Sequence, residues 1–109
     1  MKEWEIWFAE FPYEEDANIT SNRPVVILSV EPLQVLSVKV TTHEYRENDL
    51  YDVPLFHWQE CGLNWQSIAR VSKTIFLTRD HFQKKIGQLH TNDSDNIMKR
   101  YQEFINSLV

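Results

Sequence analysis

The chain contains very little cysteine and glycine. Cys61 is the only cysteine among 109 residues, so no disulfide can form within the chain. Glycine occurs only twice and 42% of the residues are hydrophobic, which is not the composition of a disordered or low-complexity chain. We therefore predict one compact domain over residues 1–109, large enough to bury a single core without covalent cross-links.

The chain also lacks long apolar runs and an excess of basic residues. Its first residues, Met1-Lys2-Glu3-Trp4-Glu5, carry no apolar stretch of the kind found in signal peptides, and no run is long enough to span a membrane. We therefore expect a cytoplasmic protein with no membrane partner. The net charge of −5 argues against a protein that binds nucleic acid over its whole surface, so any site for a polyanion must be local.

Alternating and β-branched patterns predict a protein built mainly of short strands. The expected strands are residues 4–11, 25–30, 35–42, 53–58, 68–77 and 85–89, with a short helical turn near 79–82. Pro54 would place its strand at a sheet edge, and Gly87 indicates a bulge or a close backbone approach. The first strand carries aromatic residues on both faces, so we expect a helix or another subunit to cover its second face.

A helix is predicted at the C-terminal end of the chain. Thr91 or Asn92 can cap it, and Asp93 and Asp95 lie in the first turn, where the helix dipole favours acidic residues. Its apolar stripe, expected to pack on the sheet, consists of Ile97, Tyr101, Phe104, Ile105 and Leu108. Short strands followed by one helix indicate the α+β class, as a small, strongly curled antiparallel β-barrel with a C-terminal helix.

Polar side chains at the ends of two strands are the best candidates for a functional site. Arg23 directly precedes the strand 25–30, and Thr41, Thr42 and His43 end the strand 35–42. A turn at Glu31-Pro32 joins these strands into an antiparallel hairpin, and simple register would place Arg23 and Thr41 at the same edge. Loops and strand ends of this kind present guanidinium, hydroxyl and imidazole groups to ligands.

Other familiar sites are missing from the sequence. It contains no glycine-rich phosphate loop, no nucleophile elbow and no Cys-x-x-Cys motif. His57 and Cys61 are spaced like metal ligands, but they lie across a strand end and a turn and no second ligand pair accompanies them. We therefore expect neither a metal site nor a cofactor.

Several short motifs together resemble a known family. In chain order they are Glu5-Ile6-Trp7, Arg23-Pro24-Val25-Val26-Ile27-Leu28, Val38-Lys39-Val40-Thr41-Thr42, Gly62-Leu63, Ser67 and Lys85-Ile86-Gly87-Gln88-Leu89, followed by the helix. Their order and spacing resemble those of the MazF/PemK toxins of type II toxin–antitoxin systems over nearly the whole chain. The resemblance implies an SH3-like barrel, a homodimer and a cognate antitoxin that covers the RNA groove.

The resemblance also implies a reaction and the residues that carry it. The family's activity is sequence-selective, metal-independent cleavage of single-stranded RNA through attack of the ribose 2′-hydroxyl, and its catalytic pair matches Arg23 and Thr41. A guanidinium and a hydroxyl suit the stabilisation of a charged phosphorane. Where the family often has Asp-Gln-Val-Arg, this chain has Ser72-Lys73-Thr74-Ile75. The predicted RNA contacts are Lys39, Thr42, His43, Arg46, Arg70 and Lys73.

Two non-enzymatic functions remain as alternatives. Related toxins on the same barrel poison DNA gyrase without cutting RNA, so this chain could be a non-catalytic toxin or binding module that acts by protein contact. An SH3-like adaptor would instead need an aromatic groove for proline-rich ligands. The presence of both Arg23 and Thr41 favours the enzyme, because a non-catalytic relative has no need to keep that pair.

Overall fold

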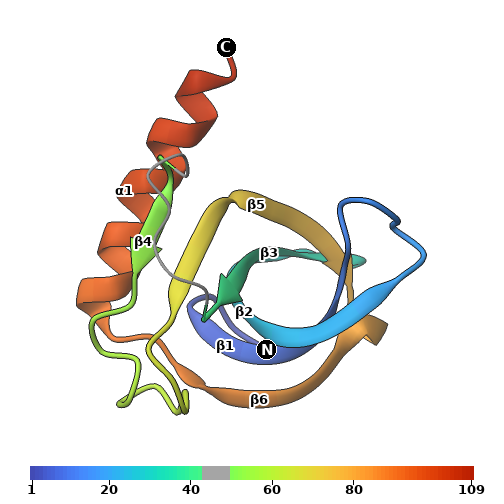
Figure 1. Cartoon of the computed structure of the whole chain (residues 1–109), viewed down its shortest axis with the longest axis horizontal. Helices are drawn as coiled ribbons and strands as arrows, with labels where there is room; N and C mark the ends of the chain where they lie inside the picture. The colour runs from blue at the N-terminus through green and yellow to red at the C-terminus, as the bar shows by residue number, and fades with distance from the viewer. Residues whose placement is uncertain (43–49) are drawn as a thin grey trace.

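The computed structural model describes residues 1–42 and 50–109 and shows a curled antiparallel sheet with one long helix beside it (Figure 1). The elements are β1 (Glu5–Pro12), β2 (Thr20–Val30), β3 (Gln34–Thr41), β4 (Asp52–Pro54), β5 (Ile68–Thr78), the 3-10 turn η1 (Arg79–His81), β6 (Phe82–Gln88) and α1 (Thr91–Ser107). The strand order is β4-β5-β3-β2-β1-β6, so β4 and β6 form the edges and the barrel is not closed. The predicted α+β architecture is confirmed.

The strand boundaries differ from the prediction at two places that matter for function. β2 begins at Thr20 instead of Val25, because its first part pairs with β1, where Ala9 lies opposite Arg23. Arg23 is therefore inside a strand and not ahead of one. β4 covers only Asp52–Pro54 of the predicted strand 53–58, but it forms a sheet edge, as Pro54 indicated.

Bulges produce the strong curl of the sheet. In the pairing of β3 with β5, Val38 lies opposite Thr74 and Lys39 opposite Arg70, so residues 71–73 of β5 have no partner on β3. The Thr74 hydroxyl donates a hydrogen bond to the Val71 carbonyl at 2.6 Å within this bulge. Because unpaired residues bend a strand and increase its twist, β5 turns sharply here.

The curled sheet packs residues from both of its faces into two apolar clusters. One cluster includes Ile6, Val26 and Val38 and extends to Ile97 of α1. A second cluster contains Ala9, Phe11, Val25 and Leu77, packed against Trp7, Ile75 and Phe82. The second face of β1 is thus covered by the curled sheet, with Trp7 edge-on to Phe82 at 6.2 Å. The other face of β1 carries Ile6, which shares a core cluster with Ile97 of α1, and Phe8, which is 36% exposed. Whether another subunit covers Phe8 stays a prediction.

The helix is attached to the sheet by its first half. His90 caps α1 by accepting a hydrogen bond from the Asn92 amide at 3.0 Å, in place of the predicted Thr91 or Asn92. The buried Asp93 carboxylate accepts hydrogen bonds from the amides of Phe56 and His57 at 3.0 and 2.9 Å. These bonds tie the segment that follows β4 to the helix.

The second half of the helix extends beyond the sheet (Figure 1). Tyr101 and Phe104 pack against the core, whereas Ile105 is 40% and Leu108 67% exposed. The expectation that the whole apolar stripe packs on the sheet is therefore wrong for its last two members. The helix is longer than the surface that it covers, so its end leaves apolar side chains in solvent.

Gly87 confirms the close approach expected from the sequence. Ile6 pairs with Gly87 and Trp7 with Lys85, which leaves Ile86 as a bulge between them. An alanine Cβ at position 87 would overlap the Cys61 carbonyl. The absence of a side chain at Gly87 therefore lets the segment between β4 and β5 lie directly on β6.

Candidate functional site

A pocket lies at the edge of the hairpin formed by β2 and β3. It has a volume of about 240 Å³ and its lining residues are Asn22, Arg23, Pro24, Val40, Thr41, Thr42 and Ser67. The pairing of Val25 with Lys39, continued by two residues, brings Arg23 opposite Thr41. The prediction that these two residues lie together at one end of the hairpin is confirmed.

The Arg23 guanidinium is half-buried and oriented from its own strand. Its Nε and Nη2 atoms donate hydrogen bonds to the Ser21 hydroxyl at 3.3 and 3.1 Å. Burial lowers the pKa of Arg23, the positive charge of Arg70 lowers it further and Tyr13 acts in the opposite direction. Arginine remains protonated despite such a shift. Within the part of the chain that the structure describes, Arg23 has no carboxylate partner, so its charge is available to an anionic ligand.

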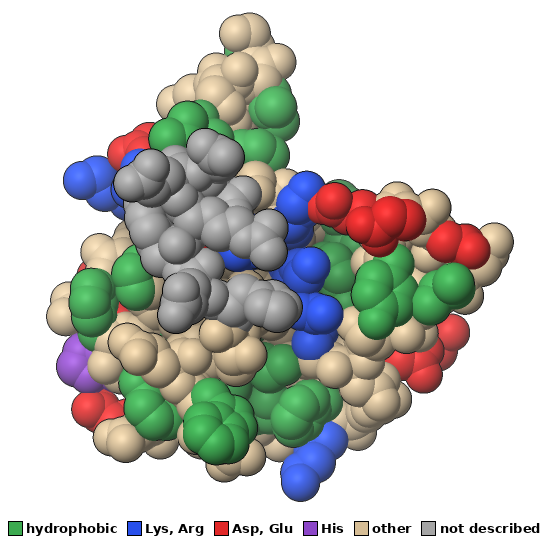
Figure 2. All heavy atoms as spheres, in the orientation of Figure 1, with side chains coloured by type: hydrophobic (Ala, Val, Ile, Leu, Met, Phe, Trp, Pro, Cys, Tyr) green, Lys and Arg blue, Asp and Glu red, His purple; other side chains and the backbone are tan. Residues whose placement is uncertain are grey.

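Further cations surround this pocket. Burial lowers the pKa of Lys39, and the charges of Arg23, Arg70 and Lys73 lower it further. Lys39 also lies 6.0 Å from the centre of the Phe11 ring. Figure 2 shows Lys and Arg side chains gathered in the middle of one face. The chain is acidic overall, but it carries a local cationic cluster, which consists of Arg23, Lys39, Arg70 and Lys73. Because the net charge is negative, a site for a polyanion needs such a local cluster.

The members of the cationic cluster differ in their accessibility. Arg70 is only 6% exposed, and its Nε and Nη2 atoms each lie 3.2 Å from an oxygen of the buried Asp52 carboxylate. Arg70 is buried because β4 pairs with β5 and supplies Asp52. Lys73 is partly exposed and forms an ion pair with Glu14.

The hydroxyl residues at the end of β3 also differ in burial. Thr41 is 4% exposed, whereas Thr42 is exposed at the rim of the pocket. Two other predicted RNA contacts, His43 and Arg46, lie outside the described residues.

Sequence reasoning missed two serines of this site, namely Ser21, which bonds to Arg23, and Ser67, which lines the pocket. Ser21 is two residues before Arg23, and alternate residues of a strand share a face, so this spacing could have revealed it. Ser67 lies far along the chain and is 3% exposed, with its hydroxyl donating to the Trp65 carbonyl at 2.7 Å. In the sequence it stands out only as part of a motif, because only the folded sheet brings it beside Thr41.

A group of possible metal ligands occurs elsewhere, at His57, Glu60 and His90, whose ligand atoms lie within 4.8 Å of one another. The two imidazole rings are stacked with their centres 3.7 Å apart. Each Nδ1 atom already has a partner, because that of His57 lies 3.0 Å from Glu60 and that of His90 caps the helix. Cys61 is not part of this group, since its thiol donates to the Trp58 carbonyl. These contacts have a structural role in attaching the segment to α1.

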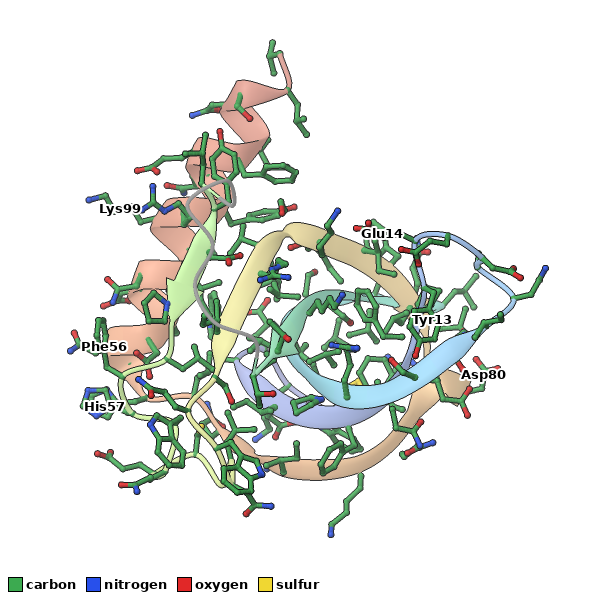
Figure 3. All side chains as sticks on the ribbon, in the orientation of Figure 1. Tyr13, Glu14, Phe56, His57, Asp80 and Lys99 are labelled. Carbon is green, nitrogen blue, oxygen red and sulfur yellow. The ribbon has the colours of Figure 1, made fainter. Side chains whose placement is uncertain are left out.

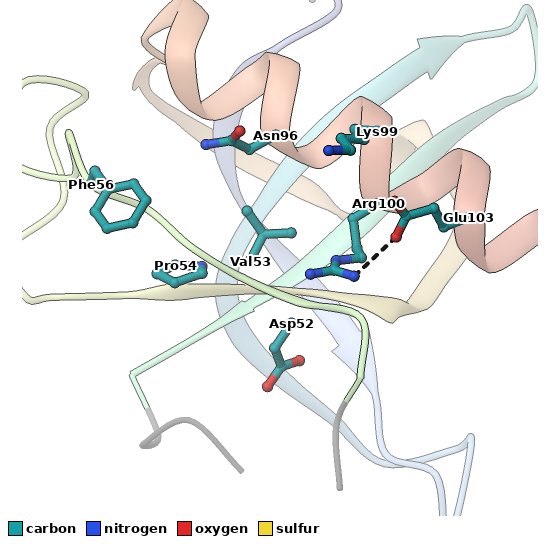
Figure 4. A pocket seen from close by; sticks show the side chains of 8 residues that line it. All are labelled: Asp52, Val53, Pro54, Phe56, Asn96, Lys99, Arg100 and Glu103. Atoms are coloured by element: carbon teal, nitrogen blue, oxygen red, sulfur yellow. Dashed lines mark hydrogen bonds and ion pairs between the residues drawn. The ribbon is translucent and has the colours of Figure 1, made fainter. Parts of the chain in front are cut away.

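Another pocket, of about 300 Å³, lies between β4 and α1 (Figure 4). Its charged groups are largely engaged, since Arg100 pairs with Glu103 at 2.9 Å and the Asp52 carboxylate bonds to Arg70. It does not combine an available guanidinium with hydroxyl groups as the hairpin pocket does. The hairpin pocket is therefore the better candidate site.

The sequence model of the "PemK-like, MazF-like toxin of type II toxin-antitoxin system" family matches residues 2–105. The chain belongs to this toxin family. The match confirms the resemblance seen in the sequence motifs and covers every element of the fold except the end of α1. A search of curated protein sequences found no match to this member of the family.

Some of the solved structures with the same fold come from mycobacteria. The chain resembles the Mycobacterium tuberculosis toxin MazF-mt6 with a TM-score of 0.73 and 20% identity, over 94% of this chain and 96% of that one. It also resembles an endoribonuclease in complex with its cognate antitoxin from a mycobacterial species, with a TM-score of 0.77 and 13% identity, over 97% and 95% of the two chains. At these identities the likeness concerns the fold. Among the described residues, no helix of this toxin is both long and apolar enough to cross a membrane.

Proposed function

We propose that this PemK-like toxin is an endoribonuclease that cleaves single-stranded RNA at selected sequences without a metal ion. The observation that carries the proposal is the shared pocket of Arg23 and Thr41, in which the guanidinium has no carboxylate partner among the described residues. Membership of the toxin family supports it, as does the likeness in fold to proteins described as endoribonucleases.

The proposed reaction is an internal transfer at one phosphate of the RNA. The ribose 2′-oxygen forms a bond to phosphorus and loses its proton, while the bond to the 5′-oxygen of the next nucleotide breaks and that oxygen gains a proton. Arg23 donates to the non-bridging oxygens as negative charge develops, and the Thr41 hydroxyl adds a further donor. Removing one such donor typically costs about 100-fold or more in rate. Because donors on the protein neutralise this charge, the proposed mechanism needs no metal ion.

The other residues of the site are assigned to binding the RNA. Lys39, Thr42 and Lys73 are accessible on the face that carries the pocket and are proposed to contact phosphates or bases, together with His43 and Arg46. Arg70 is predicted to act differently, because its guanidinium is held by Asp52. We propose that Arg70 adds to the positive electrostatic potential of the site and does not contact the RNA directly.

The products of cleavage test the proposed mechanism. A synthetic RNA incubated with the toxin should yield fragments that end in a 2′,3′-cyclic phosphate and begin with a 5′-hydroxyl, because the 2′-oxygen is the nucleophile. EDTA should leave the rate unchanged. Mass spectrometry of the fragments, with and without EDTA, measures both. Fragments with 5′-phosphates or loss of activity in EDTA would contradict the mechanism, and growth inhibition without RNA cleavage would favour a toxin that acts by protein contact.

We further propose that the toxin is a cytoplasmic homodimer neutralised by a cognate antitoxin. Exposed apolar side chains on β1 and α1 support a dimer, since Phe8 is 36%, Ile105 40% and Leu108 67% exposed. Stable interfaces of this kind bury more than about 1,000 Å². Light scattering at micromolar concentration should give twice the chain mass, and L108E should shift the toxin toward monomer. A monomeric wild type would contradict the proposal.

A further inference from the structure

A further cavity lies near the hairpin pocket, between the loop after β1 and the bulge of β5. It has a volume of about 210 Å³, and its walls include the aromatic side chains of Phe11 and Tyr13. Lys39 and Lys73 line it together with a single acidic residue, Glu14. The cavity therefore combines apolar walls with two ammonium groups next to the site proposed to cleave RNA.

Glu14 connects the two sides of this cavity. Its carboxylate forms an ion pair with Lys73, which lies among the β5 residues that have no partner on β3. Figure 3 shows Glu14 beside the sharp turn of β5, with Tyr13 next to it in the chain. The neighbouring acidic residues differ from Glu14, since Asp16 accepts a hydrogen bond from the Asn18 amide and Glu15 forms no ion pair with a described residue. Of this acidic run, only Glu14 forms an ion pair with the cationic cluster, as far as the described residues show.

The Glu14 carboxylate pairs with Lys73 and is also attracted by two other members of the cationic cluster, Lys39 and Arg70. The hydrogen bond and charge of Lys73 lower the pKa of Glu14 most, and the charges of Lys39 and Arg70 lower it further. A carboxylate and a phosphate both offer anionic oxygens to ammonium groups. Glu14 thus interacts with the groups that a phosphate of bound RNA would require.

We propose that Glu14 occupies a phosphate-binding subsite formed by Lys73 and Lys39, and that single-stranded RNA must displace it in order to bind. The inference rests on the proposed function, in which RNA is the ligand of this face. In the bound state a phosphate next to the cleaved one replaces the Glu14 carboxylate on Lys73, and the adjoining base reaches the apolar walls of the cavity. Glu14 is then an internal competitor that weakens RNA binding.

The exposure of the ion pair permits such a displacement. The Lys73 and Glu14 side chains are 38% and 57% exposed, so water screens their attraction. Exposed pairs of this kind change an equilibrium by a factor of roughly two to five. The ion pair can therefore be opened by RNA, yet its loss should be measurable.

The test compares two variants that change the net charge equally. Glu14→Gln frees Lys73, whereas the matched control Glu15→Gln removes a charge from the same loop without touching the cluster. The probe is a 2′-O-methyl RNA, which binds but cannot be cleaved. We expect Glu14→Gln to lower Kd by about two- to five-fold and Glu15→Gln to change it far less. Equal Kd values for the two variants would overturn the inference.

The salt dependence and a second substitution identify the subsite. Each phosphate contact of single-stranded RNA contributes about 0.7 to the slope of log Kd against log salt, so Glu14→Gln should steepen this slope by up to that amount. Lys73→Met should weaken binding more in the Glu14→Gln background than in the wild type. An equal effect in both backgrounds would show that Glu14 and RNA do not compete for Lys73.

Two further outcomes separate this inference from related proposals. If the toxin binds the 2′-O-methyl RNA but does not cleave ordinary RNA, the proposed enzymatic function fails while the comparison of variants still tests the subsite. If Glu14→Gln tightens binding of a poly-glutamate peptide but not of RNA, the cluster belongs to an acidic protein partner and the inference is overturned.

Discussion

Replacing Arg23 with alanine should reduce RNA cleavage by about 100-fold or more, because it removes the donor assigned to the developing charge on the phosphate. The Ser21 hydroxyl orients this guanidinium in the wild type. Arg23→Lys should restore the charge without the planar pair of donors, so its activity should stay well below that of the wild type. Single-turnover cleavage of a fluorescent RNA measures the chemical step in each variant.

Arg100→Ala is the matched control for this loss. Arg100 is a partly exposed arginine on α1 and pairs only with the neighbouring Glu103 among the described residues, so its loss changes the net charge by the same amount away from the hairpin pocket. Its cleavage rate should remain within about two-fold of the wild type, since exposed pairs contribute little. Thermal unfolding should show that Arg23→Ala is folded. A folded Arg23→Ala variant that cleaves at the wild-type rate would exclude Arg23 from the reaction.

Replacing Gly87 with alanine should destabilise the toxin severely, by more than about 3 kcal/mol. The new Cβ would overlap the carbonyl of Cys61, and a backbone atom cannot move aside as a flexible side chain can. Relief of the clash would separate β6 from the segment that contains Cys61, which packs into the main core. Urea unfolding followed by circular dichroism measures the free energy of unfolding.

Gln88→Ala serves as the control for this substitution. Gln88 follows Gly87 on the same strand and is exposed, so the change should alter the free energy of unfolding by less than about 0.5 kcal/mol. A Gly87→Ala variant as stable as Gln88→Ala would mean that the segment does not lie on β6 as closely as described. Severe loss in Gly87→Ala alone would support the contact.

Local patterns in the sequence were enough to predict the central part of the candidate site. The hairpin of β2 and β3 joins segments that are close in the chain, so its register follows from a short turn and strand alternation. That register alone placed Arg23 near Thr41. The edge position of Pro54 and the close approach at Gly87 were predictable for a similar reason, because each depends on the chemistry of one residue type.

The ends of the elements were less predictable. β2 begins earlier than expected because β1 supplies hydrogen-bond partners to residues that look like a loop in the sequence. His90 caps the helix although Thr91 and Asn92 are the more usual capping residues, since its Nδ1 atom reaches the Asn92 amide. Such boundaries depend on competition between neighbouring groups, which strand and helix periodicity do not describe.

The sequence by itself determined the curled α+β architecture, the toxin family and the meeting of Arg23 with Thr41, because these depend on local pattern and motif order. Only the tertiary structure decided which cations of the site are accessible. Strand pairing between β4 and β5 buries Arg70 against Asp52, and the β5 bulge brings Lys73 to Glu14. These partners are far apart in the chain, and no sequence periodicity predicts their contact. Which cations of the site are paired with a carboxylate is therefore decided only when the sheet curls.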